Sequence, residues 1–131
     1  MKAWALDSSA LMTFFEDRPG ADKVEELLAK ATANDPLWMS VVNWGEVYYS
    51  VWRARGERSA TATLREIAQL PIEVVDVDME MARLAASLKA EHNLPYADCF
   101  AAALARARKA VLVTSDRDFE RIEGSLRILW V

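Results

Sequence analysis

Three aspartates occupy positions at which a carboxylate is well placed to do chemistry. Asp7 directly follows the largely apolar run 2–6, and Asp116 comes two residues after the apolar run 111–114. Asp98 lies in an alanine-rich stretch that is otherwise uncharged. Carboxylates that converge bind hard divalent cations such as Mg²⁺ or Mn²⁺, and a cation held in this way promotes hydrolysis of phosphodiesters.

Glu46 is a fourth candidate, although its spacing says less. Apolar residues recur around it at helical spacing, at Trp44, Val47, Tyr48 and Val51, and a helical wheel places Glu46 off this stripe. An ordinary exposed helix glutamate fits this position as well as a site residue does. The case for Glu46 therefore depends on evidence other than periodicity.

Each aspartate also has a purely structural interpretation. Asp7 can accept a hydrogen bond as the N-cap of a following helix. Asp116 and Asp118 can stabilise the positive end of a helix, and Ser115 with Asp118 has the spacing of a capping box. Asp98 benefits in the same way from the first turn of its own helix. Taken singly, these roles explain the residues without any catalytic function.

The acids taken together are harder to explain by helix stability. Two carboxylates about 4 Å apart repel each other by roughly 4 kcal/mol at an effective dielectric constant near 20. A group of converging acids would therefore destabilise the fold unless a cation neutralised it. Because the candidate ligands are all oxygens, the sequence favours magnesium or manganese.

Short strands and helices alternate along the chain and would position these acids. Strands are predicted at 2–6, 37–39, 72–75, 111–114 and 127–129. Helices are predicted from 8 or 9 to 15, with Ser8 or Ser9 as cap, and at 21–33, 41–55, 57–70, 79–91, 96–108 and 115–122. This alternation predicts an α/β fold, a parallel sheet of about five short strands flanked by helices on both faces. Ligands of such sheets bind at the carboxyl ends of the strands, where Asp7 and Asp116 fall.

The composition restricts the alternatives. The chain has 131 residues and a formal charge of −4, which argues against binding nucleic acid by a bulk positive field alone. Cys99 is the only cysteine and His92 the only histidine, which excludes an internal disulfide and leaves little for a zinc site. We expect one domain over residues 1–131 and a cytoplasmic protein without membrane spans.

Four motifs follow one another along the chain. They are Ala5–Leu11 (ALDSSAL), Asn43–Glu46 (NWGE), Tyr96–Ala103 (YADCFAAA) and Thr114–Phe119 (TSDRDF). Each motif is weak alone, but the four in this order and at this total length are highly specific. Together they resemble the PIN domain family, and they are most similar to the VapC-type toxins of prokaryotic toxin–antitoxin pairs.

This resemblance implies a metal-dependent endoribonuclease that hydrolyses RNA phosphodiester bonds, often in transfer or ribosomal RNA. It implies a three-layer PIN-like fold with Mg²⁺ or Mn²⁺ as the cofactor. The catalytic and metal-binding quartet of the family corresponds to Asp7, Glu46, Asp98 and Asp116. Secondary candidates for the same site are Thr114, Asp118 and Ser8.

The resemblance also implies three partners: an RNA substrate, a cognate antitoxin protein and a second copy of the chain in a homodimer. RNA needs positive countercharge around an acidic pocket. The candidates for phosphate contacts are Arg53, Arg55, Arg58, Arg117 and Arg121. The aromatic residues near Glu46 are expected in the core or at an interface with a second copy or an antitoxin helix, and stacking on RNA bases is the alternative; they are Trp44, Tyr48, Tyr49 and Trp52.

Other interpretations make different demands on the sequence. A receiver-like signalling domain needs a lysine at the end of its last strand, where this chain has ILWV over 128–131. A haloacid-type phosphatase needs an aspartate two residues after the first, where this chain has Ser9. A PIN nuclease of RNA processing that is not a toxin stays open, as does a non-catalytic PIN module. The intact acidic quartet argues against the latter, because a degenerate site has no reason to keep the repulsion.

Overall fold

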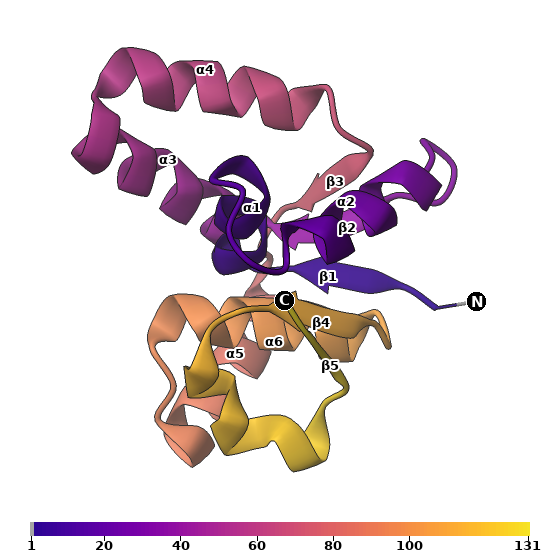
Figure 1. The fold of residues 1–131 in the computed structure, drawn as a ribbon. Helices are drawn as coiled ribbons and strands as arrows, with labels where there is room; N and C mark the ends of the chain where they lie inside the picture. Colours follow the sequence, from indigo (N-terminus) through magenta and orange to yellow (C-terminus); the bar gives the residue numbers. More distant parts are fainter. Residues whose placement is uncertain (1) are drawn as a thin grey trace.

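The computed structural model describes residues 2–131, in which five strands form one parallel sheet (Figure 1). The strands are β1 (Trp4–Leu6), β2 (Leu37–Ser40), β3 (Ile72–Val75), β4 (Val111–Thr114) and β5 (Ile128–Trp130). Their order across the sheet is β3-β2-β1-β4-β5, and every neighbouring pair is parallel. The predicted α/β fold with a parallel sheet is confirmed.

Helices connect the strands. They are α1 (Ser8–Phe15), α2 (Ala21–Lys30), α3 (Val41–Arg55), α4 (Glu57–Ala68), α5 (Met79–His92), α6 (Tyr96–Ala107) and the 3₁₀ helix η1 (Arg117–Ser125). Two α-helices lie between each pair of consecutive strands up to β4, and η1 lies between β4 and β5. Among the helices of residues 2–131, none has the length and apolar character that a bilayer crossing requires.

The two faces of the sheet carry separate hydrophobic cores. On one face, Ala5 and Leu112 pack with buried residues of α5 and α6. The next residues along the same strands, Leu6 and Val113, pack with α1 to α4 on the other face (Figure 1). Because successive residues of a strand point to opposite faces, these apolar strands suit a sheet that is covered on both sides.

Two helices end earlier than their apolar spacing predicts. The helix predicted over 21–33 ends at Lys30, because Ala31 adopts an extended backbone with φ −75° and ψ 152°. The helix predicted over 57–70 ends at Ala68, two residues earlier than predicted, and residues 69–71 connect it to β3. Apolar spacing continues past both helix ends, so periodicity alone overestimates their length.

The C-terminal part of the chain differs most from the prediction. The segment predicted as an α-helix over 115–122 is the 3₁₀ helix η1, which extends to Ser125. The last strand begins at Ile128, one residue later than predicted. It pairs with β4 in a register that puts Ile128 opposite Leu112. A short polar segment of this kind has no sustained periodicity that would separate 3₁₀ from α geometry.

Replacing Leu112 with alanine should destabilise the protein by about 2–5 kcal/mol, since the side chain is fully buried in β4 and its loss leaves a cavity. Met79→Ala is the matched control, because Met79 is 90% exposed and should change stability by less than about 0.5 kcal/mol. Urea unfolding monitored by circular dichroism measures both. Equal effects of the two substitutions would contradict this assignment of the core.

Candidate active site

The acidic residues gather where β1 and β4, two neighbouring strands, reach their carboxyl ends. Asp7 directly follows β1, and Asp116 lies two residues beyond β4. Helix α6 contacts both strands, and its first turn brings Asp98 to the same edge. This is the edge at which open parallel sheets bind their ligands.

Asp7 is both the N-cap of α1 and a buried member of this group. Its Oδ1 accepts a hydrogen bond of 2.9 Å from the Ala10 amide, so the caps predicted at Ser8 or Ser9 are wrong. Asp7 is only 2% exposed. Burial raises the pKa of Asp7 to about 6, against hydrogen bonds from Thr114 and Ser9 that lower it.

Two hydroxyl groups hold the Asp7 carboxylate. Ser9 Oγ donates to Oδ1 at 2.7 Å, and Thr114 Oγ1 donates to Oδ2. As donors, the two hydroxyls stabilise the ionised form of Asp7 and oppose the effect of burial on its pKa. The same hydroxyl oxygens accept from the amides of Ser115 and Asp116, each at 2.9 Å. The end of β4 is thereby tied to the start of α1.

Asp98 has the least satisfied carboxylate of the group. It is 6% exposed, and its Oδ2 is buried without a hydrogen-bond partner among residues 2–131. Burial, the charges of Asp116, Asp7 and Glu46, and a side-chain hydrogen bond with Asp116 raise the pKa of Asp98 to about 8. A buried carboxylate oxygen without a donor is unfavourable, so this position needs a proton or a cation.

Asp116 and Asp118 form a cluster with Asp98. One carboxylate oxygen of each lies within 4.8 Å of the other two. Asp116 also caps η1, because its Oδ1 accepts from the Asp118 amide at 2.9 Å. The capping box predicted for Ser115 and Asp118 is therefore wrong. Asp118, a secondary candidate in the sequence, lies among the principal acids.

Glu46 joins the group from α3. Its Oε1 accepts hydrogen bonds from Ser8 Oγ at 3.0 Å and from Asn43 Nδ2 at 2.9 Å. Its charge contributes to the raised pKa of Asp98, so the four predicted acids share one electrostatic environment. Ser8 thus contacts Glu46, whereas its neighbour Ser9 contacts Asp7.

This donor set fits a hard divalent cation. The candidate ligands are carboxylate oxygens, and one of them, Asp98 Oδ2, is buried and unpaired. Among the described residues, this cluster of possible ligands contains only aspartates and neither cysteine nor histidine, the ligands that zinc prefers. A magnesium or manganese ion would relieve both the repulsion and the missing hydrogen bond.

The sequence matches the family model of the PIN domain over residues 5–125, a range that includes every acid described above. The chain belongs to the PIN domain family. A search of curated proteins found no match.

Solved structures share this fold over nearly the whole PIN domain. The Sarcin-Ricin loop cleaving toxin VapC20 of Mycobacterium tuberculosis is 17% identical, with 95% of this chain and 96% of that chain covered and a TM-score of 0.74. A chain of VapBC-5, a toxin–antitoxin system of the same organism, is 26% identical, with 100% of both chains covered and a TM-score of 0.66. A chain of VapBC2 from Rickettsia felis, crystallised with a DNA fragment from its promoter, is 21% identical, with 97% of both chains covered and a TM-score of 0.73.

One of the five candidate arginines of the PIN domain contacts the acid cluster. Arg121 lies 3.9 Å from Asp118 and donates a 2.9 Å hydrogen bond to the Asn93 carbonyl, in the turn before α6. The other four are exposed and have different neighbours: Arg53 lies over the Tyr49 ring, Arg55 near Glu16, Arg58 in the first turn of α4, and Arg117 over the Trp130 ring. Within residues 2–131, Arg121 is therefore the one of these five arginines that forms an ion pair with the acid cluster.

The aromatic residues of α3 divide between core and surface. Trp44 and Tyr48 pack against the core between the sheet and α1 to α4. Tyr49 and Trp52 are 48% and 44% exposed. The predicted core position therefore applies to the first two, whereas Tyr49 and Trp52 lie at the surface, with Arg53 over the Tyr49 ring.

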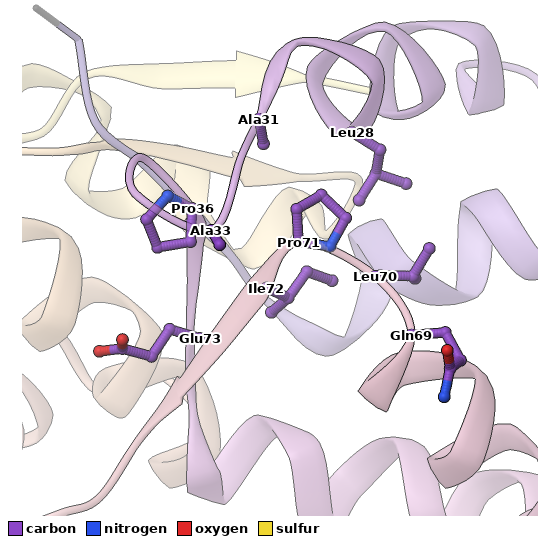
Figure 2. Close-up of a pocket in the computed structure, with 9 residues that line it drawn as sticks. All are labelled: Leu28, Ala31, Ala33, Pro36, Gln69, Leu70, Pro71, Ile72 and Glu73. Carbon is purple, nitrogen blue, oxygen red and sulfur yellow. The ribbon is translucent and has the colours of Figure 1, made fainter.

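Figure 2 shows the residues that line a surface hollow. The hollow lies at the end of the sheet opposite to the acids, which follow the carboxyl ends of β1 and β4. It forms where β2 and β3 begin, and Leu28, Pro36, Pro71 and Ile72 contribute to its mainly apolar lining. Glu73 is its only acidic lining residue. Because the hollow has no converging carboxylates, the acid cluster is the candidate active site of this PIN domain.

Two residues of the site were not among the candidates from the sequence. Ser9 holds Asp7, and Asn43 holds Glu46. Asn43 lies three residues before Glu46, a spacing that puts two side chains on one face of a helix. A search for polar residues at helical spacing from each acid would have identified it.

In the absence of metal, Asp98→Asn should raise the free energy of unfolding of the PIN domain, and this gain should increase with pH. The pKa of Asp98 rises from its usual 3.8 to about 8 in the folded state, so the folded state binds more protons than the unfolded state between these values. The free energy of unfolding therefore falls as the pH increases through this range. Asparagine removes this penalty, so the difference in the free energy of unfolding between the variant and the parent should grow as the pH rises.

Urea unfolding in EDTA at about pH 5.5 and about pH 8 measures this difference. Asp22→Asn is the control, because Asp22 is an exposed acid of α2. An Asp98→Asn variant with the same stability as the parent at both pH values would contradict the assignment.

Proposed function

We propose that this PIN domain is a Mg²⁺-dependent endoribonuclease that hydrolyses RNA phosphodiester bonds. Asp7, Glu46, Asp98 and Asp116 are its catalytic and metal-binding residues, and residues 1–131 are a single nuclease domain. The observation that carries the proposal is the buried, unpaired Asp98 Oδ2 surrounded by other carboxylates. Such an arrangement has little value for stability, and it suits a cation that binds phosphate.

The residues of the chain have distinct parts in this activity. Asp7, kept as an acceptor by Ser9 and Thr114, is a ligand whose position is fixed before the cation binds. Asp98 keeps a proton near neutral pH in the metal-free protein and must release it from its carboxyl group to act as a ligand. Asp116 and Glu46 complete the set. A bound Mg²⁺ supplies Lewis-acid stabilisation of the phosphate charge during hydrolysis.

We further propose that the chain is the toxin of a type II toxin–antitoxin pair. The solved structures with this fold include toxin–antitoxin complexes from several bacteria, one of them from Klebsiella pneumoniae. In this chain, the exposed Tyr49 and Trp52 of α3 supply apolar surface for an antitoxin helix or a second copy in a homodimer. The RNA substrate is a transfer or ribosomal RNA, with Arg121 the best-placed of the candidate phosphate contacts.

Removal of divalent cations should abolish RNA cleavage, and Mg²⁺ or Mn²⁺ should restore it. The acids supply the ligands for such a cation, and the described acid cluster includes no histidine that could deprotonate water in its absence. The measurement is cleavage of total RNA by the purified protein after dialysis against EDTA, with and without added metal. Cleavage that persisted after complete chelation would show a metal-free mechanism.

Asp98→Asn should reduce cleavage by about 100-fold or more, which exceeds the loss typical of residues outside the ligand set. The cleaved ends are mapped in total RNA after brief induction of each variant, and Asp22→Asn, an exposed acid of α2, serves as control. New 5′ ends should appear with the parent and with the control, and they should be missing with Asp98→Asn. Cleavage at the parental rate by Asp98→Asn would refute the metal-site assignment.

A further inference from the structure

Asn43 is a fully buried polar residue of α3 that contacts two parts of the site. It is 0% exposed. Its Nδ2 donates to Glu46 Oε1 at 2.9 Å and to the Ala97 carbonyl at 3.2 Å. Ala97 immediately precedes Asp98, so one amide group links the Glu46 carboxylate to the first turn of α6.

These two acceptors determine the orientation of the amide. If the group were rotated by half a turn, Oδ1 would face a carboxylate oxygen and a carbonyl oxygen, neither of which can donate. In the observed orientation both N–H groups are used, and Oδ1 is buried without a partner among residues 2–131. The two donated bonds therefore outweigh the unsatisfied oxygen.

Packing alone does not explain an asparagine at this position. A buried amide oxygen without a donor is unfavourable, and an apolar side chain of similar shape would avoid that penalty. Leucine has the same branching as asparagine, with methyl groups in place of the amide oxygen and nitrogen. The amide is explained by the hydrogen bond that it donates, which holds the Glu46 carboxylate in place.

Glu46 is fixed at one oxygen only. Oε1 accepts from Asn43 and from Ser8 Oγ at 3.0 Å, so α1 and α3 both hold it. The other oxygen, Oε2, accepts no hydrogen bond from residues 2–131 and is left for a ligand. Because Asn43 also bonds to Ala97, a shift of the Glu46 side chain would disturb the contact between α3 and α6.

We infer that Asn43 is a positioning residue: it holds Glu46 for cation binding and ties it to the start of α6, which carries Asp98. This inference rests on the proposed function, since it takes Glu46 as part of a metal site. Asn43 itself does not touch the substrate or the cation.

The test measures the affinity for Mn²⁺ by isothermal titration calorimetry, with the whole chain stripped of metal by EDTA. Asn43→Leu keeps the shape of the side chain and removes both donors, and it should weaken Mn²⁺ binding by about 10- to 100-fold. In a Glu46→Ala background the same substitution should change the affinity less than about twofold, because Asn43 acts through Glu46. Asn43→Ala, which leaves space instead of filling it, repeats the comparison if the leucine variant does not fold.

Val47→Ala is the matched control, since Val47 is also fully buried in α3. It should lower the stability and leave Mn²⁺ affinity within about twofold of the parent. Equal Mn²⁺ affinity of the parent and the folded Asn43 variant would overturn this inference alone. The inference would also be overturned if the Asn43 substitution weakened Mn²⁺ binding as much in the Glu46→Ala background as in the parent, because Asn43 would then act by packing. Absence of Mn²⁺ binding by the parent would overturn the proposed function, and this inference with it.

Discussion

Repulsion among carboxylates at one edge of a parallel sheet is the constraint on which the site depends. The sheet places Asp7 and Asp116 at the ends of two neighbouring strands, and α6 adds Asp98 from the same side. Burial and the neighbouring charges raise the pKa of Asp98 to about 8, well above the usual range of a carboxylic acid. The two covered faces of the sheet supply stability that compensates for this unfavourable arrangement, and a bound cation would relieve it.

The structural and chemical roles of the acids coexist. Asp7 and Asp116 each cap a helix with one oxygen, and this capping fixes the side chain that the site uses. Asparagine caps a helix about as well as aspartate does, so an Asp→Asn change removes charge and largely keeps the cap. The hydroxyls of Ser9 and Thr114 act similarly, since they bind the Asp7 carboxylate and also join β4 to α1. The site is therefore rigid where the helices begin.

The sequence was sufficient for the strands and for the aspartates at their ends, because alternating apolar runs and helical segments admit few topologies. It was insufficient for Glu46, since helical periodicity gives an exposed glutamate and a site glutamate the same position. In the structure Glu46 accepts hydrogen bonds from Ser8 of α1 and Asn43 of α3, contacts that periodicity does not predict. Local charge clusters also do not report which arginine reaches the acids, and among the five candidates the structure pairs Arg121 with Asp118.

The central claim is that these carboxylates form a cation site, and anomalous diffraction from crystals soaked in Mn²⁺ tests it most directly. The account predicts an anomalous peak among Asp7, Asp98 and Asp116, with Asp98 Oδ2 directed at it, and a much weaker peak in Asp98→Asn crystals. The absence of any peak at this position, or a peak of equal height in the Asp98→Asn variant, would contradict the account.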